Sequence, residues 1–513
     1  MFWPTLEESM PEPNGNEINI YFSDYFGVPS EVVEEAGAFN ISLINDLPLF
    51  IDPFLLFNSQ NPQYQKLHDE MIGYLRFLRD KSLTGSINDG LLRAWFKFSE
   101  VKQTWLGFSR VGNGGSGLGM DFAKTLNGNL NSVFSDFGQE GTNRIARGSH
   151  LEKLCLISEG VGKDNISDFT TNLIKEWLLN YTQAFARAHI SKRLRRNVAV
   201  PRVRFNYKSQ IWEPAMFELP YFKRDYVILT PTDMLTKDDT WINRPDLIDD
   251  YPMIVATVPN EQLRAQLNNY LISVLPLKPT EKDRDAAIAG AYRKFPELLE
   301  YYIRYKEDNG SEAKNISDEK VAESKSLYID HVRALVRELL EESGFYAIGG
   351  RTYDEARSRV TFLKDVVENK DGYRIFYDGS KRLVRKEQDL HILYRLTWFG
   401  TPSDINREVN NGRGPVDFSV SRGSKDKSLV EFKLASNPQL KKNLTNQVAI
   451  YQKASDAPKA LKVIFFFSGE ERVRVQGILK ELDLLGNEDI ILVDARHDNK
   501  PSASKATSED SGN

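Results

Sequence analysis

The stretch GRGPVDFSVSRGSKDKSLVEFKLASN, residues 412–437, constrains the fold most strongly because it places charged side chains inside two apolar runs typical of strands. Asp417 lies in the first run, and Glu431 and Lys433 lie in the second. Residues two apart in a strand share a face, so Glu431 and Lys433 project together while Phe432 faces the core. If the runs pair as a hairpin, Asp417 approaches Glu431. Because burying charge is costly unless it is paired or binds metal, these residues form either an ion pair or a site.

The segments around this hairpin alternate between predicted strands and predicted helices. Asn437-Pro438 is a good helix start, since proline is tolerated in the first helical turn. Strands that alternate with helices indicate a mixed α/β sheet. The predicted order is helix 385–399, strand 404–409, strand 416–421, strand 428–435, helix 438–454, strand 462–468, helix 471–485 and strand 489–495.

A change in composition predicts the division of the chain. Residues 306–320 contain almost no apolar side chains, which predicts a surface linker over 306–325. Residues 1–305 are expected to form a mixed, largely helical α+β region, with substrate or partner recognition as one role it could serve. Residues 326–497 form the second region, and the polar tail 498–513 is expected to be disordered.

Composition fits a globular protein, with 41% hydrophobic and 27% charged residues among 513. The net charge of −5 gives no global sign of nucleic-acid binding, but residues 381–462 hold 16 Lys and Arg against 8 Asp and Glu. That local balance suits attraction to phosphate. The single cysteine, Cys155, excludes a disulfide framework within the chain and any Cys-rich zinc site. No signal peptide or membrane span is predicted, so we expect a cytoplasmic protein.

The sequence contains PVD, then E-x-K with its glutamate fourteen residues after the aspartate, and then a predicted helix. This order resembles the PD-(D/E)xK nuclease superfamily. The resemblance covers about 110 residues, 386–496. It implies a restriction-endonuclease-like α-β-β-β-α-β core and Mg²⁺-dependent hydrolysis of phosphodiester bonds, with Mn²⁺ expected to substitute. On the family pattern, Asp417 and Glu431 hold the metal together with the backbone carbonyl of Phe432. Lys433 then positions the attacking water.

The same resemblance implies residues around the metal. Gln447 and Tyr451 are four apart on a predicted helix and resemble the Q-x-x-x-Y motif of RecB-type nucleases, which helps to hold substrate. Many members carry a further acidic residue, and both Glu408 and Glu387 fit, with Glu408 favoured by proximity. The predicted catalytic set is Asp417, Glu431, Lys433, Glu408, Gln447 and Tyr451.

Family precedent favours DNA over RNA as substrate, a role in phage defence or restriction, and a homodimer or a partner defence or repair protein. Two alternatives stay open. One is a catalytically silent nucleic-acid-binding module. The other is a nucleotide-binding regulatory protein built on the G-x-G-x-x-G of Gly112, Gly114 and Gly117 with Asp136, for which a glycine-rich loop is the simpler interpretation. A second basic cluster, 192–204, could extend a binding surface or simply face solvent.

Overall fold

The computed structural model describes residues 20–85, 87–107, 118–133, 148–157, 161–237, 239–333, 351–369, 372–377, 404–410, 415–422, 426–451 and 459–499, with His391, Tyr394 and Trp398. For residues 404–410 and 446–451 the description covers the backbone alone. Within these ranges, no helix combines the length and apolar character needed to cross a bilayer.

The N-terminal region is largely helical, with short strands and one long hairpin, as the sequence predicts. The hairpin strands β2 (Arg195–Asn206) and β3 (Ile211–Phe222) pair antiparallel, and the short β4 (Asp225–Tyr226) pairs antiparallel with the end of β3. Strands β1 (Phe50–Ile51) and β5 (Leu235–Thr236) form a separate antiparallel pair. The helices are α1 (Phe22–Phe26), α2 (Ser30–Glu35), α3 (Pro53–Phe57), α4 (Pro62–Thr84), α5 (Asp89–Leu91), α6 (Met120–Val133), α7 (Lys153–Ile157), α8 (Lys163–Leu173), α9 (Lys175–His189), α10 (Arg244–Asp249), α11 (Tyr251–Thr257), α12 (Glu261–Val274), α13 (Glu281–Lys294), α14 (Glu297–Asp308) and α15 (Gly310–Lys325).

Residues 167–190 carry apolar side chains about every four residues, a pattern that predicts one continuous helix, but the structure divides them between α8 and α9, which meet at Ile174. Phe169 on α8 packs into one hydrophobic core, whereas Ile174 and Leu178 pack into another. The chain therefore changes direction where its apolar face passes from one core to the other. A periodic stripe predicts helix along its whole length and carries no sign of this break.

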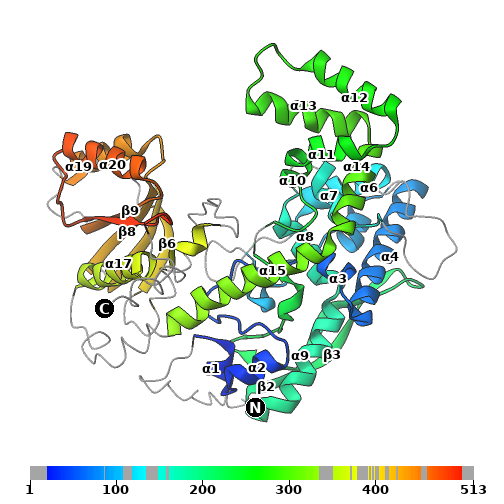
Figure 1. Cartoon of the computed structure of the whole chain (residues 1–513). Helices are drawn as coiled ribbons and strands as arrows, with labels where there is room; N and C mark the ends of the chain where they lie inside the picture. The colour runs from blue at the N-terminus through cyan, green and yellow to red at the C-terminus, as the bar shows by residue number, and fades with distance from the viewer. Residues whose placement is uncertain are drawn as a thin grey trace, which may run out of the picture.

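The predicted surface linker, 306–325, is helical instead, which corrects the sequence interpretation. Helix α15 buries Ala313 and Val321, and the buried Lys320 donates a hydrogen bond to the carbonyl of Tyr377. The segment packs despite its polar sequence because its charged side chains find partners inside the protein. Figure 1 shows α15 leading from the N-terminal helices toward the C-terminal sheet.

The C-terminal region is built on a mixed five-stranded sheet of order β10-β9-β8-β7-β6, and all five predicted strands are present. Strands β6, β7 and β8 are antiparallel neighbours, whereas β8, β9 and β10 are parallel. Parallel neighbours need a crossover connection, which α19 and α20 supply. The bounds are β6 (Asp404–Asn410), β7 (Pro415–Arg422), β8 (Asp426–Leu434), α19 (Leu440–Tyr451), β9 (Lys459–Phe466), α20 (Gly469–Glu481) and β10 (Ile490–Asp494).

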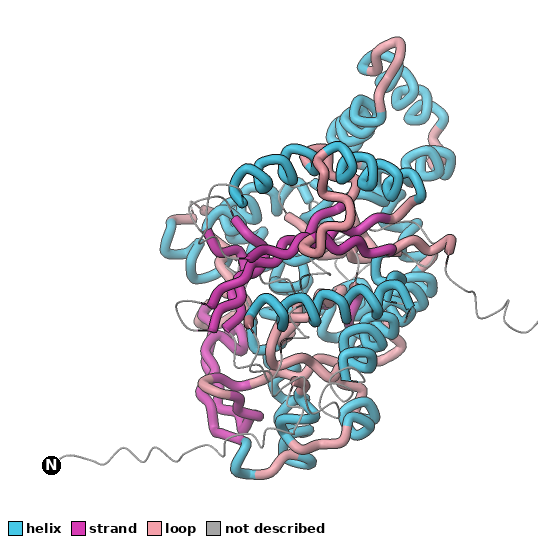
Figure 2. Tube along the Cα trace, turned by 90° about the vertical axis from the view of Figure 1, so that its left-hand side faces the viewer, coloured by secondary structure: helices cyan, strands magenta, loops and turns pink. Residues whose placement is uncertain are grey.

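Helices cover both faces of this sheet. Helix α17 (Thr352–Asn369) packs on one face and α19 and α20 lie on the other (Figure 1), and the turned view of Figure 2 shows the strands between them. Phe418, Phe432 and Phe465 share the core on the α17 side, whereas Leu440 and Ile464 pack in a smaller core under α19 and α20. The alternation of side chains along β8 thus determines which of them face α19 and which face α17.

A buried histidine in the N-terminal region gives a prediction about pH. The His150 ring is fully buried, with Nε2 2.8 Å from Glu307 Oε1. Burial lowers the pKa of His150 to about 4, and Glu307 offsets only part of this effect. Below the ordinary histidine pKa of about 6.5 the unfolded chain therefore binds a proton that the folded protein does not. The contribution of the neutral, buried His150 to the free energy of unfolding is therefore complete above pH 6.5 and is lost as the pH falls toward 4.

We expect the stability advantage of the wild type over His150→Gln to shrink by about 3 kcal/mol between pH 7 and pH 4, from the size of the pKa shift. Urea unfolding of both proteins at several pH values measures this difference. His189 is exposed, so His189→Gln should keep the pH dependence of the wild type. If the difference in stability between the wild type and His150→Gln stays constant with pH, the folded protein does not hold His150 in its neutral form.

Candidate active site

Strand β8 presents Glu431 and Lys433 on one face. Its buried positions are Ser428, Val430 and Phe432, which alternate with partly exposed ones. This period of two places Glu431 and Lys433 on the face opposite Phe432. The charged pair therefore lies on the α19 side of the sheet, and the aromatic core lies on the α17 side.

Strand β7 brings Asp417 to the same place. The antiparallel register pairs Phe418 with Val430, and Asp417 Oδ2 accepts a hydrogen bond of 2.6 Å from the backbone N–H of Phe432. The Lys433 ammonium lies between the carboxylates, with Nζ 3.8 Å from Asp417 Oδ2 and 3.6 Å from Glu431 Oε1. The structure thus brings together three of the residues predicted from sequence, each with a side chain about one-sixth exposed.

Sequence reasoning missed a second lysine at this site. Lys462 on β9 is the register partner of Glu431, and its Nζ contacts Glu431 Oε2. The side chain is 4% exposed. Burial lowers the pKa of Lys462 to about 7, and the Asp417 carboxylate acts in the opposite direction. The available signal was a charged residue at the start of the apolar run KVIFFFS.

A buried histidine also reaches the site. His391 Nε2 lies 3.9 Å from Asp417 Oδ2, and its ring packs against Phe418 and Phe432 with centroids 5.4 and 5.6 Å away. The ring is therefore held by the aromatic core while its nitrogen faces the carboxylate. The signal in the sequence was the spacing of His391 and Tyr394, which are three apart in the predicted helix and share one face of it.

Other predicted site residues are placed only in part. Glu408 lies on β6 between residues that pair with Phe418 and Val416, so its backbone is opposite Asp417, but its side chain is outside the description. Gln447 and Tyr451 lie on α19 as predicted, again with the backbone alone described. The remaining candidates lie outside the described residues: Glu387, Gly112, Gly114, Gly117 and Asp136.

The donor set at the site is suited to a hard cation. Asp417 and Glu431 offer carboxylate oxygens, and Mg²⁺ is usually held by one or two carboxylates, with water and substrate phosphate as its other ligands. Over the described ranges, no group of three or more His, Cys, Asp and Glu side chains is arranged to hold a metal. Asp417 and Glu431 could therefore hold a hard cation such as Mg²⁺ in its usual manner.

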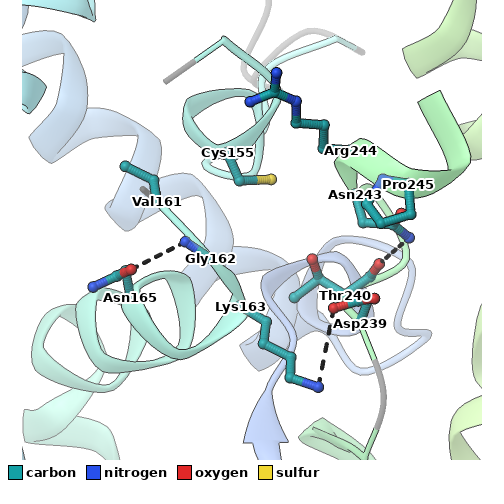
Figure 3. Close-up of a pocket in the computed structure, with 10 residues that line it drawn as sticks. All are labelled: Cys155, Val161, Gly162, Lys163, Asn165, Asp239, Thr240, Asn243, Arg244 and Pro245. Carbon is teal, nitrogen blue, oxygen red and sulfur yellow. Dashed lines mark hydrogen bonds and ion pairs between the residues drawn. The ribbon is translucent and has the colours of Figure 1, made fainter. Parts of the chain in front are cut away.

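The N-terminal region contains a separate cavity of about 440 Å³, which shares no residue with the site above (Figure 3). Lys163 and Arg244 line it together with Asp239, whose Oδ1 lies 4.0 Å from Lys163 Nζ. Cys155 also lines it, and burial raises the pKa of its thiol, so the thiol stays protonated and unreactive. Gly162 caps the start of α8 beside this cavity, and Lys163 is the first residue of that helix.

Two family models match the chain. The first, Domain of unknown function (DUF8370), covers residues 27–243, and the second, Domain of unknown function (DUF8371), covers residues 352–469. No curated protein and no solved structure matches the chain. The second match includes α17 and strands β6 to β9, and thus contains Asp417, Glu431, Lys433 and Lys462.

Proposed function

We propose that the C-terminal region is a Mg²⁺-dependent nuclease that hydrolyses phosphodiester bonds. The observation that carries the proposal is the placement of Lys433 between Asp417 and Glu431, within 4 Å of both carboxylates, on one face of neighbouring strands. Two carboxylates that project from neighbouring strands onto one face suit a site that binds a hard cation, and a lysine beside them can position a water molecule.

The order of elements supports assignment to the PD-(D/E)xK superfamily. Strands β6, β7 and β8, helix α19 and strand β9 follow one another in the order β-β-β-α-β that comes after the first helix of that core. The acidic residues lie on the second and third of these strands, where the family pattern places them. We therefore propose the restriction-endonuclease-like fold for residues 386–496, with the predicted helix 385–399 as its first helix.

Each residue of the site would have its own role in hydrolysis. Asp417 and Glu431 would hold Mg²⁺ with the carbonyl of Phe432, and the ion supplies Lewis-acid stabilisation of charge on the phosphate. The Phe432 N–H fixes the orientation of the Asp417 carboxylate. Lys433, between the two carboxylates, would orient the attacking water by hydrogen bonding and stabilise negative charge as the new P–O bond forms.

The surroundings of the site complete the proposal. Gln447 and Tyr451 on α19 would hold the substrate backbone, and Glu408 on β6 would supply a further acidic group. We propose DNA as substrate and a role in restriction or phage defence, with the N-terminal region recognising substrate or partner. We further propose that the protein acts in the cytoplasm, either as a homodimer or together with a repair or defence protein.

A cleavage assay tests the proposal. Wild type and Lys433→Ala are incubated with linear duplex, circular duplex, single-stranded DNA and RNA, in Mg²⁺, Mn²⁺ or EDTA. We expect metal-dependent cleavage by the wild type and a loss of about 10²–10³-fold in the variant, the usual cost of removing one group that stabilises charge in the transition state. Lys441 is a half-exposed lysine on α19, and Lys441→Ala should cleave normally.

Two outcomes would contradict the proposal in different ways. Cleavage that survives Lys433→Ala would place the chemistry elsewhere in the chain. If the wild type binds nucleic acid but cuts nothing in any metal, the silent binding module is the better interpretation.

A separate measurement tests the alternative of a nucleotide-binding regulator. Unchanged thermal stability with ATP or NAD would argue against it, because ligand binding raises stability by mass action.

A further inference from the structure

The two oxygens of Glu431 face two different lysines. Oε1 lies 3.6 Å from Lys433 Nζ, whereas Oε2 contacts Lys462 Nζ. Lys433 is also close to Asp417, with its Nζ 3.8 Å from Oδ2. Lys462 approaches from β9, on the side away from Asp417's strand.

The position of Lys462 is fixed by the sheet. Strand β9 lies between β8 and β10, and the Lys462 backbone N–H donates to the Asp489 carbonyl at 2.8 Å. Its register partner on β10 is Ile490, which offers no charge. A buried ammonium is costly without a partner, so the contact with Glu431 holds this side chain in place.

This arrangement leaves little room for a second metal ion. Two-metal sites place their ions about 3.5–4 Å apart, usually bridged by a shared carboxylate. At Glu431, an ion on the Oε2 side would have to displace the Lys462 side chain, whose Nζ already contacts that oxygen.

We propose that Lys462 takes up one oxygen of Glu431, Oε2, and so leaves Asp417 and Glu431 able to hold only one divalent ion. This inference rests on the proposed function. Lys462 is a positioning residue, because it acts on Glu431 and not on the substrate. It limits the site to a single metal ion and lowers the affinity for that ion.

Equilibrium binding of Mn²⁺, measured by electron paramagnetic resonance and calorimetry, tests the inference without any substrate. The wild type should bind one Mn²⁺ per chain. Lys462→Met preserves length and removes the charge, so we expect a second Mn²⁺ to bind, or the first to bind about tenfold more tightly or better. Lys441→Met is the matched control and should behave as the wild type. Thermal melting shows whether Lys462→Met is folded. Lys462→Gln serves as a second substitution in case Lys462→Met is misfolded.

The outcomes separate this inference from the proposed function. Two Mn²⁺ ions in the wild type, or unchanged stoichiometry and affinity in both folded Lys462 variants, would overturn the role of Lys462 and leave the nuclease proposal standing. No Mn²⁺ binding by the wild type or by any variant would overturn the metal site itself, and the inference with it.

Discussion

Replacing Asp417 with asparagine should lower metal-dependent cleavage by about 10³-fold while the protein stays folded. Losing one electrostatic group from an active site typically costs about 10²–10³-fold in rate, and Asp417 supplies one of two metal-binding carboxylates. The amide oxygen of asparagine can still accept the hydrogen bond that the Phe432 N–H donates to Asp417. The substitution therefore removes the charge and keeps the bond between β7 and β8.

A comparison of two substitutions at this position separates charge from structure. Asp417→Ala also removes the acceptor for the Phe432 N–H, which costs about 1–3 kcal/mol of stability for a buried donor. We expect both variants to lose cleavage and Mn²⁺ binding, but only Asp417→Ala to melt at a clearly lower temperature. Glu481→Gln on α20 is the control, since this exposed carboxylate pairs with Lys441. Full activity in Asp417→Asn would exclude the carboxylate from metal binding.

The strands and the closeness of Asp417, Glu431 and Lys433 could be predicted because local patterns determine them, whereas the roles proposed for these residues come from the family resemblance. Alternation with a period of two fixes which side chains of β8 share a face, and the hairpin between β7 and β8 fixes which residue of β7 lies opposite. Asp417, Glu431 and Lys433 follow from these two facts. The prediction therefore needed no knowledge of how distant segments pack.

Lys462 and His391 could not be predicted in the same way because both depend on contacts between distant segments. The pairing of Glu431 with Lys462 requires the register between β8 and β9, which a crossover through α19 leaves undetermined in sequence. Helix α15 shows the same limit. Its polar composition predicts a surface linker, yet Lys320 is buried because the distant Tyr377 carbonyl accepts a hydrogen bond from its ammonium group.

The substitution Glu355→Gln should destabilise the C-terminal region by about 3 kcal/mol, because it breaks a buried network of charges. Glu355 on α17 is almost fully buried, with Oε1 2.8 Å from Arg359 Nη2 and Oε2 3.0 Å from Arg422 Nη2. The Arg359 guanidinium is itself buried and lies 4.3 Å from the ring centre of Trp398. Removing the carboxylate charge leaves a buried guanidinium without the anion that compensates it.

An exposed pair in the same region provides the control for this prediction. Arg357 and Glu488 are 3.1 Å apart, with side chains 41% and 79% exposed, so Glu488→Gln should change stability by less than about 0.5 kcal/mol. Urea unfolding followed by circular dichroism compares the two variants with the wild type. Equal, small effects would mean that Glu355 does not anchor α17 to the end of β7. A large effect for Glu355→Gln alone would show that this network holds the strand that carries Asp417 against the helix beneath it.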